Sequence, residues 1–224
     1  MMAPDYEQML QEFYTSILRP GDTCIDVGAN VGRHTLPIAK CVAPGGKVFA
    51  FEPIPSVAAD LQARLSGSDI SRCIEVHQCA LSKRNGDADF TFVSNNPGYS
   101  GLRPRHYDGP VTTEIIRVRT QTLDSMANTL SPIWYIKIDC EGGELLVLQG
   151  ASALIERDRP TVTFECGDSS LESYEYGSGD VFDYWHSHNY GVESIFRQAL
   201  DRKSFIDACA RQEFWDYIAV PTKP

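Results

Sequence analysis

The sequence predicts an α/β fold of the Rossmann type, with a mostly parallel sheet and helices on both of its faces. Three observations predict it. Residues 24–27 are a short, β-branched apolar run that follows the turn pair Pro20-Gly21, as buried strands do. A glycine-containing turn and a helical pattern follow this run, and a second apolar run, Lys47–Phe51, ends in Glu52. A strand, a turn, a helix and a strand in this order form a βαβ unit, which implies parallel strands.

The turn after the first strand has residues that let a ligand approach the backbone closely. Gly28, Asn30 and Gly32 lead into a helix that we expect from about residue 33 to residue 42. Glycine adopts the backbone conformations that such a turn requires. In a βαβ unit, an acid at the end of the second strand, here Glu52, can accept hydrogen bonds from the ribose hydroxyls of a nucleoside that lies across the strand ends.

The residues of the turn favour one class of nucleoside over another. The dinucleotide pattern G-x-G-x-x-G requires glycine at positions 30 and 33, where this chain has Asn30 and Arg33. Asp26 precedes the turn, and a carboxylate there would repel a pyrophosphate but suit a cationic ligand. S-adenosylmethionine carries an ammonium, a sulfonium and a ribose. An NAD-dependent oxidoreductase is therefore disfavoured, although the sheet alone does not exclude it.

Six blocks of the sequence resemble the signature blocks of FkbM-type methyltransferases, in the same order. They are Asp26–Thr35, Phe51–Pro53, Thr122–Asp124, Ile136–Glu144, Leu148–Ala151 and Arg159-Pro160 ahead of a strand that ends in Glu165. They cover roughly residues 20–166. The resemblance implies a Rossmann-like class I methyltransferase fold with a seven-stranded, mostly parallel sheet. It also implies transfer of a methyl group from S-adenosylmethionine to a hydroxyl oxygen of a small molecule.

Length and composition limit the other possibilities. We expect one domain over the 224 residues: an N-terminal helix in 1–19, a cofactor-binding core in 20–166, and a C-terminal part in 167–224 that completes the sheet. The net charge of −10 disfavours nucleic acid and anionic membranes as partners. The chain shows neither a transmembrane-length apolar run nor a targeting pattern, so a cytoplasmic location is expected. Its seven cysteines are scattered, which predicts free thiols, and a homodimer is only the base-rate expectation.

The remaining elements follow in chain order. An amphipathic pattern predicts a helix over 5–18 that covers one edge of the sheet, and a further helix is expected over 56–66. Residues 73–77 read as the third strand; the resemblance implies that Ala80, just beyond it, borders the adenine. Strands over 134–138 and 161–164 end before Asp139 and Glu165. A helix over 179–189 and a terminal antiparallel pair, 191–196 with 214–220, complete seven strands.

An insertion interrupts the alternation of strands and helices. Residues 89–93 and 114–119 alternate like the strands of a hairpin, with a loop over about 95–110 between them. A loop of this length is usually functional or disordered, so it is either a lid over the substrate or a solvated excursion. As a lid it offers these substrate contacts: Tyr99, Ser100, Gly101, Arg103, Arg105, His106 and Tyr107. The acidic and aromatic stretch 168–176 is a second candidate lid.

Four carboxylates fall at predicted strand ends and are expected to converge on one edge of the sheet: Asp26, Glu52, Asp139 and Glu165. The residues expected at the cofactor are Asp26, Gly28, Ala29, Asn30, Gly32, His34, Glu52, Pro53, Ala80 and Asp139.

Removal of the acceptor proton leaves two alternatives open. Either Asp139 and Glu165 hold Mg²⁺, a placement similar to that in catechol-type O-methyltransferases, or Asp139, Glu141 or His106 acts as the base without a metal. Lys137 could equally pair with one of the carboxylates in a purely structural role.

The acceptor is less well defined than the cofactor. An acidic, polar rim favours the hydroxyl of a sugar or oligosaccharide, while a polyketide or peptide natural product is the alternative. A non-catalytic binding domain remains as a third class, and the presence of all four carboxylates disfavours it.

Overall fold

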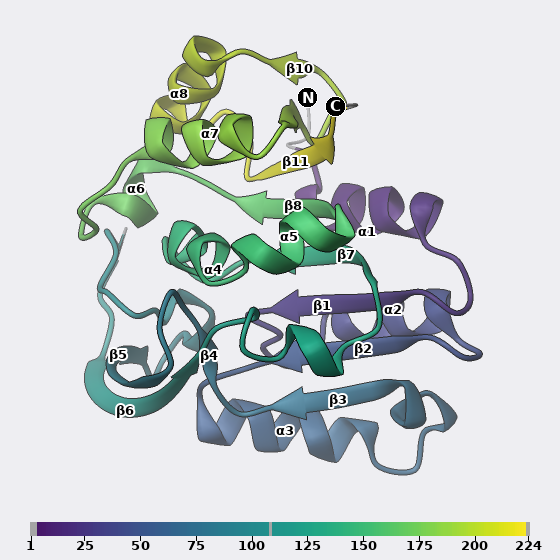
Figure 1. The fold of residues 1–224 in the computed structure, drawn as a ribbon. Helices are drawn as coiled ribbons and strands as arrows, with labels where there is room; N and C mark the ends of the chain where they lie inside the picture. The colour runs from purple at the N-terminus through teal and green to yellow at the C-terminus, as the bar shows by residue number, and fades with distance from the viewer. Residues whose placement is uncertain (1–3, 108, 223–224) are drawn as a thin grey trace.

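The computed structural model describes residues 4–107 and 109–222, and a central sheet organises them (Figure 1). The strand order is β10-β9-β11-β8-β7-β1-β2-β3. The bounds are β1 (Thr23–Val27), β2 (Lys47–Phe51), β3 (Ile74–His77), β7 (Ile133–Ile138), β8 (Thr161–Glu165), β9 (Tyr190–Ser194), β10 (Ala199–Leu200) and β11 (Asp216–Pro221). Strands β3, β2, β1, β7 and β8 are parallel, and β11 is antiparallel to both of its neighbours. The predicted mostly parallel sheet is confirmed, and the two-residue β10 is one strand more than the seven expected.

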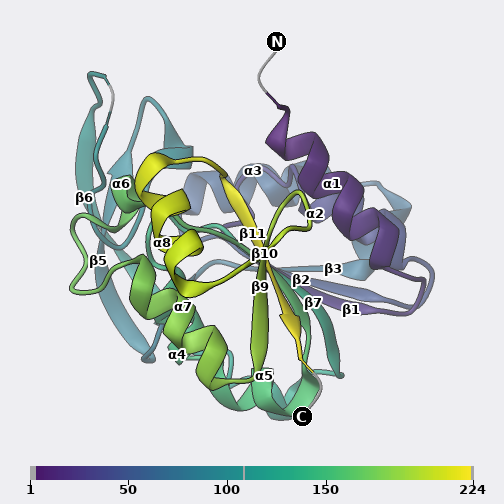
Figure 2. The same ribbon diagram turned by 90° about the horizontal axis from the view of Figure 1, so that it is seen from above.

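Helices cover both faces of this sheet, as the view in Figure 2 shows. One face carries α1 (Tyr6–Ile17), α2 (Thr35–Val42) and α3 (Pro55–Leu65); the other carries α4 (Glu144–Gln149), α5 (Ser152–Asp158), α7 (Ser178–Ser187) and α8 (Arg202–Arg211). The remaining helix is α6 (Asp168–Leu171), and three short 3-10 helices are η1 (Asp69–Cys73), η2 (Pro97–Tyr99) and η3 (Ala127–Thr129). None of the described helices is both long and apolar enough to cross a bilayer.

Helix α2 begins two residues later than predicted. Asn30 and Gly32 have positive φ angles of 48° and 88°, so the chain is still turning at these positions and the helix starts only at Thr35. Helices α5 and α8 were not predicted. Only Phe205, Ala208 and Cys209 of α8 are buried, so the helix has a weak apolar pattern in the sequence.

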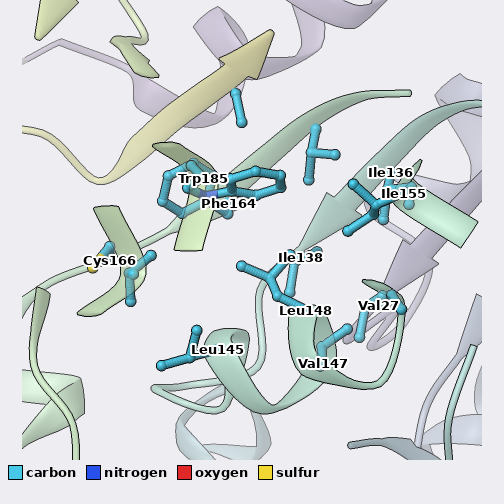
Figure 3. Packing of buried hydrophobic residues seen from close by; sticks show 14 of the residues in the cluster. Val27, Ile136, Ile138, Leu145, Val147, Leu148, Ile155, Phe164, Cys166 and Trp185 are labelled. Carbon is cyan, nitrogen blue, oxygen red and sulfur yellow. The ribbon is translucent and has the colours of Figure 1, made fainter. Parts of the chain in front are cut away.

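The alternation of side chains along the strands separates the core into two layers. Ile136 and Ile138 of β7 point, with Val27 of β1, toward α4 and α5, where they join Phe164 and Trp185 (Figure 3). The residues between them face α1 and α2, and this layer contains Cys24 and Tyr135. The same alternation places Asp26 and Lys137, which are register partners on β1 and β7, on the face of α1 and α2.

The insertion forms a second sheet beyond the carboxyl ends of the parallel strands (Figure 1). Its strands are β4 (Ala80–Leu81), β5 (Gly86–Val93) and β6 (Thr113–Gln121). β5 and β6 are antiparallel, as the hairpin prediction requires, and β4 pairs with β6. The loop between β5 and β6 folds back on β5, because Thr91 and Gly101 exchange two backbone hydrogen bonds of 2.8 and 3.1 Å.

Candidate active site

Two adjoining cavities lie at the carboxyl edge of the parallel strands. The first, of about 340 Å³, lies between the turn after β1, the end of β2 and the inserted sheet. The second, of about 380 Å³, is enclosed by the start of α1, the loop of the insertion, the ends of β7 and β8, and the start of β11. Glu7, His34 and Asp139 line both cavities, so these three residues mark the boundary between them.

The floor of the first cavity is the glycine turn, and its backbone lies against the end of β7. Gly28 has a φ of 74°, and a Cβ atom there would lie 1.8 Å from the carbonyl oxygen of Asp139. The amides of Gly28 and Ala29 both donate to the carbonyl of Phe51 at 3.0 Å. Only glycine fits at position 28, which explains how the turn can bring β1, β2 and β7 together below the cavity.

Glu52 lies in the wall of the first cavity, where the sequence predicts it. Its two carboxylate oxygens accept hydrogen bonds from the amides of Asn30 at 2.9 Å and Ile54 at 2.8 Å. The residue is only 4% exposed, and burial raises its pKa to about 7 despite these bonds. The surrounding wall is apolar and is formed by Phe51, Ile54, Leu81, Phe90 and Leu102. A fixed carboxylate beside an apolar slot of this size fits a nucleoside.

Most of the residues predicted at the cofactor line this first cavity. They are Gly28, Ala29, Asn30, His34, Glu52, Pro53, Ala80 and Asp139. Gly32 lies outside the lining and shapes the turn instead: its φ is positive, and a Cβ there would lie 2.6 Å from the side chain of Leu61.

The prediction for Asp26 needs correction, because its carboxylate does not line either cavity. The residue is 0% exposed and lies below the turn. Its Oδ2 accepts a hydrogen bond from the hydroxyl of Thr35 at 2.6 Å, and its Oδ1 lies 3.5 Å from Nζ of Lys137. A carboxylate that a buried lysine partly neutralises exerts little repulsion on a ligand above it. Asp26 therefore stabilises the start of α2 and the ammonium of Lys137, and its carboxylate does not face a cationic ligand in either cavity.

Glu7 of α1 is a site residue that the sequence did not reveal. Its carboxylate lies 2.6 Å from Nε2 of His34 and 3.3 Å from Arg33. On the other side of the imidazole, the Tyr14 hydroxyl lies 3.3 Å from Nδ1 of His34. The hydrogen bond to His34 contributes most to the lowered pKa of Glu7. Nothing in the local pattern of α1 indicates that Glu7 reaches the sheet edge, since this depends on how the helix packs.

A cluster of carboxylates lines the second cavity. Oxygens of Asp139, Glu141 and Glu165 all lie within 4.8 Å of one another. Burial and the neighbouring acids raise the pKa of Glu141 to about 8 and that of Glu165 well above its usual range. Asp216 at the start of β11 joins them, and burial together with Asp139 raises its pKa to about 7.

Two cationic side chains each pair with one member of the cluster. Nζ of Lys137 lies 3.2 Å from Asp139, and although burial opposes it, this ammonium holds the pKa of Asp139 below its usual range. Arg105 from the insertion loop forms an ion pair with Glu141. The sequence allowed a structural role for Lys137, and the structure shows one. The Lys137 ammonium keeps Asp139 ionised, while 40% of the Asp139 side chain is exposed to the cavities.

The predicted contacts of the insertion loop occupy different positions. Tyr99, Arg105 and His106 line the second cavity, whereas Ser100 lines the first and accepts a hydrogen bond from the amide of Val93 at 2.9 Å. Gly101 pairs with Thr91 in the sheet. Arg103 and Tyr107 line neither cavity, so their prediction as substrate contacts is not supported by their positions. The reason is the fold of the loop onto β5, which the sequence does not show.

The second candidate lid, 168–176, also lines neither cavity. It packs on the turn before α4, where the Tyr176 hydroxyl donates to the carbonyl of Gly142. It also contacts the first lid, because the amide of His106 donates to the carbonyl of Ser169 at 3.1 Å and the His106 side chain lies 3.8 Å from Glu172.

Known proteins resemble this chain in sequence and in fold. A family model described as the methyltransferase FkbM domain matches residues 26–192. The 31-O-demethyl-FK506 methyltransferase FkbM of Streptomyces tacrolimicus is 38% identical over 100 residues, which are 45% of this chain and 36% of that protein. The 2-O-methyltransferase NoeI of Sinorhizobium fredii is 28% identical over 170 residues, which are 68% of this chain and 66% of that protein. The chain thus spans about one third to two thirds of the length of these curated relatives.

Solved structures show the same architecture. A methyltransferase FkbM from Methylobacillus flagellatus superposes with a TM-score of 0.56 at 17% identity, over 98% of this chain and 56% of that one. The O-methyltransferase TomG from Streptomyces achromogenes, solved with S-adenosylmethionine, superposes with a TM-score of 0.52 at 11% identity, over 100% of this chain and 82% of that one. At these identities the likeness concerns the fold, and it confirms the predicted Rossmann-like class I methyltransferase fold.

Proposed function

Since the chain belongs to the methyltransferase FkbM family, we propose that it transfers the methyl group of S-adenosylmethionine to a hydroxyl oxygen of a small molecule. One observation carries this proposal beyond the family match: a cavity that fits a nucleoside adjoins a second cavity, and an ionised carboxylate, Asp139, lies at their boundary. A methyl donor and an acceptor held in these two cavities would meet beside Asp139.

The first cavity offers a partner for each part of the cofactor. Glu52 would accept the ribose hydroxyls, as acids at this position of a βαβ unit do. Ile54, Leu81 and Phe90 would cover the adenine, and the glycine turn with His34 would face the methionine part. The relatives support this cofactor, because one neighbour of the same fold was solved with S-adenosylmethionine.

When bound, S-adenosylmethionine supplies a sulfonium methyl that forms a C–O bond with the acceptor as the C–S bond breaks and the sulfur recovers its electron pair. The hydroxyl proton becomes strongly acidic as the C–O bond forms, so an ionised carboxylate of low pKa suffices to take it. Asp139 meets this requirement, since Lys137 keeps it ionised and it borders both cavities.

The two other predicted bases are less well placed. Glu141 pairs with Arg105, and the His106 side chain is 61% exposed at the rim, 3.8 Å from Glu172. We therefore propose Asp139 as the base. The cavities also hold the reacting atoms in line, which can lower a barrier by roughly 7–11 kcal/mol in favourable cases.

Mg²⁺ at Asp139 and Glu165 remains the alternative for this step. The spacing of the three carboxylates is compatible with one divalent ion. Two of them already have a cationic partner, Lys137 for Asp139 and Arg105 for Glu141, which reduces the need for a metal. The metal-free mechanism is therefore the one we favour.

For the acceptor we favour a sugar or oligosaccharide hydroxyl. The second cavity is rich in carboxylates that can accept several hydroxyl hydrogen bonds, and three aromatic residues, Tyr6, Tyr99 and Trp215, provide faces on which a sugar ring can stack. A polyketide or peptide hydroxyl is the alternative, and the name of the Streptomyces relative is consistent with it.

Transfer of a labelled methyl group tests the function. The protein is incubated with methyl-labelled S-adenosylmethionine and a panel of saccharides and secondary metabolites, each with and without EDTA. We expect the label in an alkali-stable methyl ether, at a rate that EDTA leaves unchanged. Loss of the rate on EDTA and its return with Mg²⁺ would instead establish the metal mechanism. Binding of S-adenosylhomocysteine without transfer to any acceptor would indicate a non-catalytic binding domain.

A further inference from the structure

The second cavity is lined by more carboxyl groups than cationic side chains. Of its carboxylates, Glu7 contacts His34 and Arg33, Asp139 contacts Lys137, and Glu141 contacts Arg105. Asp5 caps α1 and accepts a hydrogen bond from the amide of Gln8. Glu165 and Asp216 remain, and neither forms an ion pair with a lysine or arginine within the described residues.

Glu165 and Asp216 are direct cross-strand partners on β8 and β11. Residues opposite each other in an antiparallel pair point to the same face, and two carboxyl groups there repel each other when both are ionised. Both line the second cavity and are partly buried. The pair is consistent with a binding site for a positive charge, because a cation between the two carboxyl groups would allow both to be ionised without repulsion.

The aromatic residues of the cavity indicate the kind of cation that would fit it. The guanidinium of Arg105 pairs with Glu141 and lies 5.1 Å from the centre of the Tyr99 ring. The cavity thus already binds one organic cation between a carboxylate and an aromatic face. Two further aromatic residues, Trp215 and Tyr6, line the cavity together with Asp216 and Glu165. Aromatic faces attract organic cations, whereas a hard divalent ion prefers oxygen ligands alone.

We propose that the acceptor carries a protonated amine, which binds between Asp216 and Glu165 against the rings of Trp215 and Tyr6, while Asp139 receives the hydroxyl to be methylated. This deepens the proposed function and rests on it. The substrate class is an amino alcohol, with an amino sugar as the form that suits a polyhydroxyl-binding cavity. A protonated amine has no free electron pair, so it serves recognition and the hydroxyl oxygen remains the nucleophile.

Tyr6, Trp215 and Asp216 all lie outside residues 26–192, which the family model matches. Asp216 is the residue that we expect to determine charge specificity, because it contributes a carboxyl group without a lysine or arginine partner within the described residues and lies outside the part that the family model matches.

Two matched series of probes test the proposal on the protein saturated with S-adenosylhomocysteine. The first contains the methyl glycosides of glucosamine, N-acetylglucosamine and glucose. The second contains trans-2-aminocyclohexanol, its N-acetyl derivative and trans-1,2-cyclohexanediol. Affinities are measured by ligand-observed NMR. In at least one series we expect the amine to bind at least about tenfold more tightly than its two neutral analogues, as for a contact with a charged partner.

The variant Asp216→Asn should reduce this amine preference by about tenfold while the neutral analogues bind as before. Asp60→Asn on the exposed face of α3 is the matched control, and it should retain the full preference. A purely structural role of Asp216 would weaken all probes equally and leave their ratio unchanged.

The proposal is overturned if no amine is preferred in either series, including the case in which no probe binds, or if Mg²⁺ binds at Asp216 in place of the amines. Methylation of the nitrogen instead of the oxygen also contradicts it. Binding of S-adenosylhomocysteine, measured in the same samples, separates these outcomes from failure of the proposed function: if the nucleoside binds but amines show no preference, only the acceptor class is wrong.

Discussion

Replacing Asp139 with asparagine is expected to lower kcat for methyl transfer by about 10²–10⁴-fold, the range typical of losing a positioned base. Asparagine keeps the shape of the side chain but cannot take the hydroxyl proton. Because Asp139 also borders the first cavity, the Kd for S-adenosylhomocysteine is expected to change as well, by less than about tenfold. Steady-state kinetics and calorimetry together separate the two effects.

The control for this variant is Asp60→Asn, which alters a carboxylate on the exposed face of α3 and should leave kcat unchanged. An Asp139→Asn protein that turns over at the normal rate would show that Asp139 is not the base. The proton would then have to pass to Glu141, His106 or a metal.

Replacing Lys137 with methionine is expected to lower the free energy of unfolding by about 3–5 kcal/mol, because it leaves a buried charge without its partner. Lys137 is almost fully buried, and its ammonium lies 3.5 Å from Asp26, which is itself 0% exposed. Methionine has a similar length, so little of the loss should come from packing. Urea denaturation measures the change, provided that the slope of the free energy of unfolding against urea concentration is the same in the wild type and the variant.

The double variant Asp26→Asn with Lys137→Met is the matched control. It removes both charges, keeps a polar group beside Thr35, and should recover most of the lost stability. If the double variant is as unstable as Lys137→Met alone, the loss comes from packing and not from the unpaired carboxylate.

The sequence predicts the strands around the first cavity closely, and it predicts the position of Glu52 at the edge of the sheet, because both depend on local patterns. Lys47–Phe51 has the predicted bounds, and Glu52 follows a parallel strand whose carboxyl end must lie at the sheet edge. Asp26 also lies at a strand end, but this position does not determine the direction in which its side chain points. Asp26 belongs to the layer below α1 and α2, and its pairing with Lys137 depends on the register of two strands far apart in the chain.

The acceptor half depends on contacts that no local pattern encodes. Glu7 reaches the site because α1 packs across the edge of the sheet, and Asp216 does so because β11 lies beside β8. In the insertion loop, the pairing of Thr91 with Gly101 determines which side chains face the cavity, so Arg105 faces it and Arg103 does not. These are tertiary contacts, and the sequence offers only a set of candidates for them.

The most direct test of the account is the affinity for S-adenosylhomocysteine as a function of pH, in the wild type and in Glu52→Gln. Burial raises the pKa of Glu52 to about 7, so part of the population carries a protonated carboxyl at neutral pH. The ribose hydroxyls donate hydrogen bonds to the ionised carboxylate of Glu52. The affinity should therefore rise as the pH increases from about 6 to about 8, by at most about tenfold per unit below the pKa.

The Glu52→Gln variant should bind S-adenosylhomocysteine at least about tenfold more weakly, and its affinity should lose the part of the pH dependence that Glu52 contributes. Glu141 and Glu144 have raised pKa values near this range and remain in the variant, so the difference between the two curves isolates Glu52. A wild type and a Glu52→Gln variant with equal affinities at every pH, or a wild type that does not bind S-adenosylhomocysteine at all, would contradict the assignment of the first cavity.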